Sequence, residues 1–364
     1  MLPPIPDLPT SQGHTVKISI INGGLSCLPA AFLVDPTIKG HEEIRLSNYS
    51  FLVESMHHDR KLLFDLAFMK DLDERMPPAL KRIFEGGPGG IDASYDVPDT
   101  LIQHGVSLSS VNEIVWSHSH IDHMGDPSVF PASTDLVVGP GFRETSMPGY
   151  PTNPDAFLLD SAFEGRNVRE INFSTSSLSV GGFRAVDYFD DGSFYILEGT
   201  GHTVNHLCAL ARTTEDTFVL LAADACHHVG SLRPSEYLPL PDTIWPSVWE
   251  NYSQLTQNSS CTCSCFKAIL PESSMSQSSF YGIAPGMHED PQNARDTVQK
   301  LKAFDAHDDV FVIITHDPSL IDVVDFFPKP LNQWKEKPWA ELGRWRFLAD
   351  FKDAITEASK QETV

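Results

Sequence analysis

Short runs of apolar residues recur along this chain with the alternating pattern of β-strands. In the first half, strands are predicted for residues 15–23, 48–55, 61–68 and 112–120. The second half repeats the pattern, with strands predicted for residues 181–189, 192–200, 206–213 and 217–225. Strands that alternate with helices in two similar halves predict an α/β layered fold.

Helical spacing occurs between several of these runs. Residues 289–306 predict a helix, because Ala294, Val298 and Leu301 repeat at helical intervals and Asp290 can cap the first turn. Helices are also predicted for residues 70–87, with a break at 76–78, and for 97–105. A strand, a turn and a helix capped by Asp317 are predicted for residues 309–327, and the Trp-rich end predicts a final packed helix.

Two stretches interrupt this alternation, at about residues 139–170 and 229–289, where Gly, Pro, Ser and aromatic residues gather. We interpret them as insertions that rim a site on a single domain spanning residues 16–350, with an extended arm at 1–15 and a tail at 351–364. The aromatic residues of the insertions either line a pocket or pack the insertions themselves. These candidates are Phe142, Tyr150, Phe157, Tyr237, Trp245 and Trp249.

Charge and composition exclude several classes of partner. The formal net charge is −23, whereas nucleic acids and anionic membranes attract clustered positive charge. No apolar run is long enough to cross a membrane, and the N-terminus lacks the pattern of a signal peptide, so a cytoplasmic protein is expected. Cys261, Cys263 and Cys265 form a C-x-C-x-C run that is either a thiolate metal site or, as we favour, a partly buried loop.

The chemistry is concentrated in the segment HSHIDH. His118 and His120 lie two residues apart, so on extended backbone both imidazoles project to the same side, and Asp122 and His123 follow directly. Imidazole and carboxylate are ligands that suit Zn²⁺ and similar ions, and four of them exceed what one tetrahedral ion needs from one loop. The segment therefore predicts a pair of metal ions rather than an ordinary polar loop. Further ligands stand at later strand ends, namely His202, Asp224 and His316.

The order H-x-H-x-D-H, then G-H, then D, then H resembles the metallo-β-lactamase superfamily. The segment HIDHMGD and the additional His316 are most similar to its N-acyl homoserine lactonase branch, which includes fungal hydrolases that open lactones or γ-lactams, with roles in quorum quenching or detoxification. The resemblance implies an αββα sandwich of two mixed β-sheets flanked by helices. It also implies two divalent ions, zinc by default, with manganese, iron or cobalt as alternatives.

Carried over by position, the resemblance places metal 1 on His118, His120 and His202. Metal 2 takes Asp122, His123 and His316, and Asp224 bridges the two ions. The implied reaction is attack of a metal-bridging hydroxide on a cyclic ester or amide, with Asp122 passing a proton to the leaving atom. One position departs from the bacterial lactonases: they carry a Tyr three residues after the bridging Asp, where this chain has His227. Polarisation of the substrate carbonyl therefore falls either to metal 1 or to His227.

Other functions remain open at this point. A thioesterase of the glyoxalase II or acyl-carrier type uses the same cage, although no cluster of basic residues for a thioester's anionic tail is evident. A di-iron oxidoreductase usually carries a flavin domain for which this chain lacks room. A serine hydrolase is excluded because no G-x-S-x-G elbow occurs. A non-catalytic binding protein is disfavoured because all seven ligands are present.

Overall fold

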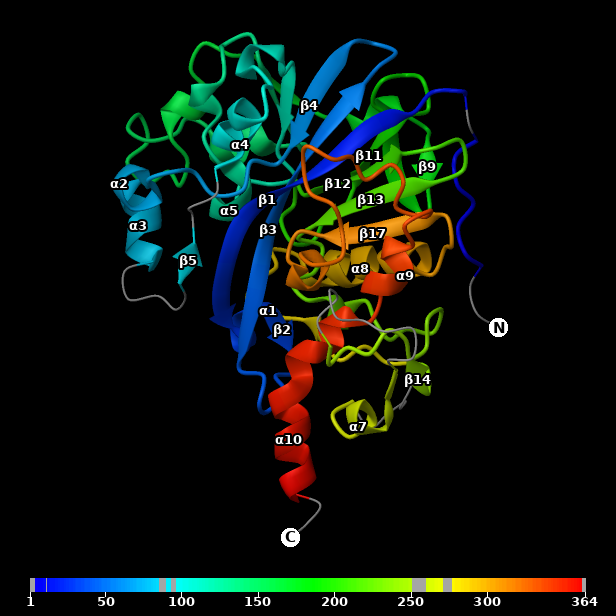
Figure 1. Ribbon diagram of the computed structural model, residues 1–364. Coiled ribbons are helices and arrows are strands. Elements are labelled where there is room, and N and C mark those ends of the chain that lie inside the picture. Colours follow the sequence, from blue (N-terminus) through cyan, green and yellow to red (C-terminus); the bar gives the residue numbers. More distant parts are fainter. Residues whose placement is uncertain are drawn as a thin grey trace.

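Two mixed β-sheets stacked face to face form the centre of the computed structural model, and helices cover their outer faces (Figure 1). The structure describes residues 4–10, 12–84, 90–92, 96–250, 260–270 and 277–361. This αββα arrangement confirms the predicted fold class.

The first sheet has seven strands, in which antiparallel pairing gives way to parallel pairing at β4. In spatial order they are β5 (Ile91–Asp92), β1 (Val16–Pro29), β3 (Glu43–Ser55), β4 (Arg60–Phe64), β6 (Glu113–Val115), β7 (Asp135–Val138) and β8 (Val168–Glu170). All strands predicted in the first half of the chain are present, with shifted ends. The sequence pattern missed β7 and β8, which are only four and three residues long.

The second sheet has six strands, antiparallel except where β13 pairs with β17. In spatial order they are β17 (Val310–Ile314), β13 (Phe218–Ala223), β12 (Leu207–Arg212), β11 (Phe194–Glu198), β10 (Phe183–Asp187) and β9 (Ser179–Val180). Two small ribbons join β14 (Thr243–Ile244) to β15 (Cys261–Thr262) and β16 (Gly282–Ile283) to β2 (Val34–Asp35).

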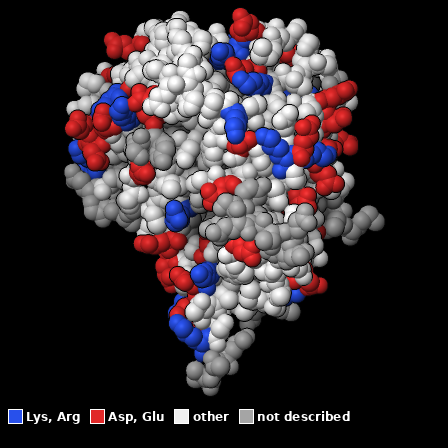
Figure 2. Space-filling view, viewed as in Figure 1, with Lys and Arg blue, Asp and Glu red and all other residues white. Residues whose placement is uncertain are grey.

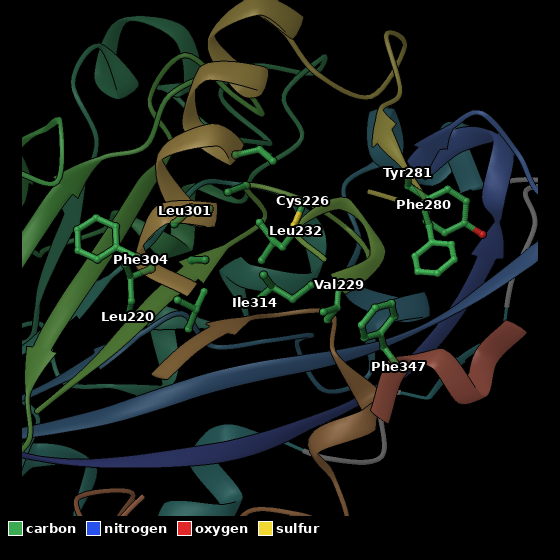
Figure 3. Close-up of a cluster of buried hydrophobic side chains, with 14 of the residues drawn as sticks. Leu220, Cys226, Val229, Leu232, Phe280, Tyr281, Leu301, Phe304, Ile314 and Phe347 are labelled. Carbon is green, nitrogen blue, oxygen red and sulfur yellow. The ribbon is translucent and has the colours of Figure 1, made fainter. Parts of the chain in front are cut away.

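The hydrophobic core is layered like the fold. Alternate side chains of the two sheets, such as Phe51 and Ile196, fill the space between them. On the outer face of the second sheet, Leu301 and Phe304 of α8 (Pro291–Asp305) belong to the same buried cluster as Leu220 of β13 (Figure 3). A third cluster lies beneath the helices that cover the first sheet. Each sheet therefore has both faces buried, which explains why several strands are apolar without interruption.

Helix α8 forms where its spacing predicts, and the Asp290 carboxylate accepts hydrogen bonds from the backbone N–H groups of Gln292 and Asn293. The predicted 70–87 helix is two short ones, broken as expected before Pro78, and its residues 85–87 lie outside the described part. The other helices are α1 (Ala30–Leu33), α2 (Leu72–Arg75), α3 (Pro78–Phe84), α4 (Val97–Gln103), α5 (Ile121–Met124), α6 (Phe142–Ser146), α7 (Ser264–Lys267), α9 (Trp339–Gly343) and α10 (Lys352–Gln361).

The C-terminal part differs from the predicted pattern in two respects. After Asp317 the chain forms only the 3₁₀ turn Pro318–Leu320, because the following residues continue as turns that pack Val323 and Val324 against the core between the sheets. The segment predicted as a tail is largely the helix α10, which projects from the body of the molecule (Figure 1). Further 3₁₀ turns are Leu108–Ser110, Pro127–Val129, Asp160–Ala162, Phe173–Thr175, Val229–Ser231 and Arg346–Phe351.

Acidic and basic side chains are interspersed over the face of the molecule that Figure 2 displays, with the acidic ones in excess over the whole chain. Among the helices of the described residues, none is both long and apolar enough to cross a membrane.

Candidate metal centre

The seven residues predicted as ligands all follow the carboxyl ends of strands. His118 and His120 come just after β6, and Asp122 and His123 lie in the single turn of α5. The other three residues follow strands of the second sheet: His202 follows β11, Asp224 directly follows β13, and His316 follows β17. The two stacked sheets bring these strand ends together, so that residues almost 200 positions apart meet in one place.

One group of ring nitrogens surrounds His202. Its Nε2 lies 3.2 Å from His118 Nε2 and 2.9 Å from His120 Nδ1. The Asp224 carboxylate completes the group, with Oδ2 3.6 Å from His202 Nε2 and 3.8 Å from His118 Nε2. These four residues form a set whose ligand atoms converge closely enough to hold one ion.

A second group shares Asp224. His123 Nε2 lies 3.0 Å from Asp224 Oδ1, and His316 Nε2 lies 3.0 Å from Asp224 Oδ2. Asp122 Oδ2 stands 3.6 Å from His316 Nε2 and 3.9 Å from His123 Nε2. This set can also hold one ion. Because one carboxylate belongs to both groups, the two positions adjoin, as in a dinuclear centre.

The donor set fits metal ions better than it fits hydrogen bonding among the side chains. Ligand atoms on a tetrahedral ion at roughly 2.0–2.1 Å lie about 3.3 Å apart, close to the nitrogen separations around His202. Buried His123 Nε2 and Asp224 Oδ1 lie 3.0 Å apart without the alignment of a hydrogen bond, and neither atom has a hydrogen-bond partner elsewhere in the described part of the chain. Burial also lowers the pKa of His118 and His202 well below the usual range, so both rings are neutral, the form that binds metals.

The electrostatics of the second group point the same way. Burial alone would lower the pKa of His123, but the carboxylates of Asp224, Asp65 and Asp122 raise it well above its usual value. Burial would likewise raise the pKa of Asp224, yet His123 and His316 hold it well below its usual value. A proton on His123 therefore offsets the negative charge of these carboxylates, and a bound metal cation can replace that proton.

Residues behind the ligands orient them. The buried Asp65, just after β4, accepts hydrogen bonds from His123 Nδ1 at 2.9 Å, from the Ser117 backbone N–H at 2.6 Å and from Ser117 Oγ at 2.7 Å. The backbone carbonyl of Ser47 accepts from His316 Nδ1 at 2.8 Å. Such partners fix which ring nitrogen faces a metal. Sequence analysis did not single out Asp65, although a lone Asp after an apolar strand was a usable signal.

His227, one of the two candidates for polarising the substrate carbonyl, also lies at this place. Its Nε2 is 3.4 Å from Asp224 Oδ2, and its side chain is buried. His288, which the pattern gave no reason to select, joins His202 and His227 in a third group of converging ring nitrogens. His57 and His58 lie in the β3–β4 turn and join none of these groups.

A cavity of about 620 Å³ opens beside the metal ligands. His120, Asp122, Asp224, His227 and His316 form part of its wall. The rest is mostly apolar and comes from strands of the first sheet, from connecting segments such as the loop after β11, and from both predicted insertions. It includes Leu28, Leu33, Leu46, Phe68, Leu80, Ile83, Phe84, Ile91, Met147, Phe157, Leu158, Val204 and Met287. Among the described residues of its wall none is Lys or Arg, whereas Asp155 and Glu289 add acidic groups.

Most of the aromatic residues considered as pocket walls do not line this cavity. Phe157 does, but Phe142 is buried in the core of the first sheet, and Trp249 stacks on Phe266 at 5.5 Å between ring centroids. Tyr150, Tyr237 and Trp245 do not line the cavity either, and Trp245 is 49% exposed. Cys261, Cys263 and Cys265 join no ligand group in the described part of the chain, and Cys263 is fully buried in the core.

The site places two adjoining His/Asp ligand groups at the strand ends of a two-sheet sandwich. This arrangement is that of a metal-dependent hydrolase. No protein-family profile matches the chain. It is 40% identical over 361 residues to the γ-lactamase FDB1 of Fusarium pseudograminearum (strain CS3096), covering 96% of this chain and 86% of that protein. It is also 40% identical over 369 residues to the metallo-hydrolase mfmC of Annulohypoxylon moriforme, covering all of this chain and 94% of that protein.

The folded structure has relatives as well. A solved N-acyl homoserine lactone hydrolase, with its product bound at the catalytic metal centre, aligns with a TM-score of 0.57 at 15% identity, covering 87% of this chain and 99% of that one. This likeness concerns the fold. The full-length matches show that the chain belongs to the family of hydrolases that contains the γ-lactamase and the metallo-hydrolase above, and its fold agrees with the resemblance to metallo-β-lactamases.

Proposed function

We propose that this enzyme opens an uncharged cyclic ester or amide, a lactone or γ-lactam, by metal-dependent hydrolysis. The observation that carries the proposal is the pair of ligand groups sharing Asp224 at the wall of an apolar cavity. The names of the relatives support the substrate class, since γ-lactamase and lactone hydrolase both act on cyclic carbonyl compounds.

In this proposal one ion is held by His118, His120 and His202, and the other by Asp122, His123 and His316, with Asp224 contributing to both. Zinc is the expected metal because neutral imidazoles and carboxylates make up the donor set, and manganese, iron and cobalt accept the same ligands. When bound, such ions supply Lewis acidity and lower the pKa of water.

The chain's own residues then handle the proton and the substrate oxygen. Asp122 stands in the cavity wall with 17% of its side chain exposed, so its carboxylate can take the proton that the attacking water releases. As the ring C–O or C–N bond breaks, that proton passes to the leaving oxygen or nitrogen. His227, also in the wall, donates an N–H to the carbonyl oxygen as negative charge develops there.

The cavity wall favours neutral substrates over anionic ones. Its apolar residues suit an alkyl or aromatic substituent, and a volume of about 620 Å³ admits a small organic molecule. Asp155 and Glu289 repel a carboxylate or phosphate placed beside them. This arrangement argues against glutathione or phosphopantetheine thioesters, whose anionic tails need basic partners.

A turnover panel on metal-analysed protein tests the proposal. Uncharged γ-lactones and a fused aromatic lactam should be hydrolysed, and activity should disappear with a chelator and return with zinc. A carboxylated β-lactam and a glutathione thioester should react at least tenfold more slowly, because Asp155 and Glu289 repel their carboxylates. A tenfold slower reaction corresponds to a barrier about 1.4 kcal/mol higher. Dominant thioester cleavage would refute the substrate class while leaving the metal centre standing.

The role of Asp122 has its own test. Asp122→Asn keeps an oxygen ligand but cannot carry a proton, so a variant that still binds two ions should lose turnover by about 10²-fold or more. Full turnover with both ions bound would remove Asp122 from the mechanism.

A further inference from the structure

The imidazole of His288 is buried without any partner in the described part of the chain. Its side chain is 5% exposed, and neither Nδ1 nor Nε2 forms a hydrogen bond there. Leaving a buried polar group unsatisfied is destabilising, so two such atoms on one ring call for a specific explanation. The residue lies at the end of the 229–289 segment, next to the cavity-lining Met287 and Glu289.

Two imidazoles of the metal centre surround His288. Its ring centroid lies 5.1 Å from that of His202 and 5.4 Å from that of His227, and the three residues offer ring nitrogens within 4.8 Å of one another. Their placement is rigid, because the backbone N–H groups of Glu289 and Asp290 donate to the carbonyls of His202 and Gly201, each at 3.0 Å. The Nδ1 atoms of His202 and His227 also have no partner among the described residues.

The hydrogen-bond donors and acceptors of the three rings complement one another. His202 directs Nε2 at the first ligand group, so its proton is on Nδ1, which must donate. His227 has Nε2 on the side of Asp224 and the cavity, so a proton on that nitrogen leaves Nδ1 as an acceptor. A neutral imidazole at His288 has one donor and one acceptor. It supplies the acceptor that His202 needs and the donor that His227 needs.

We propose that His288 is a positioning residue that links His202 to His227 through one water at each step. One ring nitrogen of each residue lies within 4.8 Å of one nitrogen of the other two, and two hydrogen bonds of roughly 2.7–3.2 Å that meet at a water span such a separation. The link keeps the proton of His227 on Nε2, facing Asp224 and the cavity, and it holds the ring of His202 in its ligating orientation. This inference rests on the proposed function, in which His227 donates to the substrate carbonyl.

Two substitutions separate the hydrogen-bonding role from packing. His288→Phe fills the space of the ring without donor or acceptor, whereas His288→Gln restores one of each. The matched control is His41→Phe, which removes another buried imidazole, one whose Nδ1 bonds Tyr281 away from the cavity. Three quantities are measured on folded protein: the His227 tautomer from long-range ¹H–¹⁵N correlation spectra, the ion affinities by chelator competition, and kcat and KM.

His288→Phe should lower the affinity for one of the two ions by about 10- to 100-fold and kcat by about tenfold, with KM within about twofold of the wild type. Its spectra should show His227 protonated on a mixture of both nitrogens, whereas the wild type and His288→Gln show Nε2 only. His41→Phe should change none of these. Unchanged tautomer and ion affinity in folded His288→Phe would overturn the inference, as would a third ion per wild-type chain that this substitution removes. If the wild type opens no lactone or lactam while tautomer and ion affinity respond as described, the proposed function fails and the network stands.

Discussion

Replacing Asp65 by Asn should strongly weaken the binding of one of the two metal ions, although the side chain keeps its shape. Asp65 Oδ1 accepts from the Ser117 backbone N–H, and Oδ2 accepts from Ser117 Oγ and His123 Nδ1. An Asn amide has only one oxygen. If that oxygen replaces Oδ1, the NH₂ group faces His123 Nδ1–H; if it replaces Oδ2, the NH₂ group faces the Ser117 N–H. In either orientation the NH₂ group, which is itself a donor, faces another donor.

The magnitude follows from that conflict. An unsatisfied buried donor costs about 1–3 kcal/mol, which is a factor of roughly 5 to 150 in affinity. His123 can escape the conflict by moving its proton to Nε2, but that nitrogen then cannot bind a metal. Losses of about 10- to 100-fold are typical when the partner behind a ligating His is removed. We therefore expect the ion held by His123 to bind about 10- to 100-fold more weakly.

The assay is a titration of metal-free protein with zinc in competition with a chromogenic chelator, resolving the two ions. Backbone strain does not confound it, because Asp65 has φ 62° and Asn tolerates that left-handed conformation as well as Asp does. Asp59→Asn is the matched control, since Asp59 also has a positive φ, 48°, but is exposed in the β3–β4 turn. Two ions bound by Asp65→Asn with wild-type affinity would refute the reasoning.

Three further predictions concern stability. Arg233→Met should destabilise the protein by about 3–5 kcal/mol in denaturant unfolding, because it leaves the buried Asp305 carboxylate without its bidentate partner at 2.5 and 2.7 Å; an unchanged midpoint would contradict this. Burial lowers the pKa of His41 from 6.5 to about 4, so between those values only the unfolded chain binds the proton. Stability should therefore fall as pH drops through that window, and His41→Phe should flatten this part of a pH–stability curve. Gly139→Ala places a Cβ 1.8 Å from the Asn205 carbonyl oxygen and should lower the melting temperature by several degrees, since a backbone shift costs about 1–3 kcal/mol; no change would show that the loops separate freely.

The parts of this protein that the sequence determines by itself are local. Alternation of apolar residues located the longer strands but not the short β7 and β8, and Asp290 with its helical spacing located α8, because these signals depend on neighbours within a few residues. The segment from His118 to His123 likewise identified a metal site, since four ligating side chains there serve no purpose in packing. Each of the other three ligands, His202, Asp224 and His316, lies at a strand end and is a weak signal alone. Only together do they indicate the remaining ligands of two metal ions.

Tertiary structure decided everything that depends on contacts between distant segments. It brought Asp224 between two ligand groups, set Asp65 behind His123, and placed His288 beside His202. It also determined which residues line the cavity, and these include Phe157 but not Phe142 or Trp249. The sequence alone does not determine these contacts. Whether a polar atom has a partner, or whether an aromatic ring lines the cavity, depends on the stacking of two sheets whose strands come from opposite halves of the sequence.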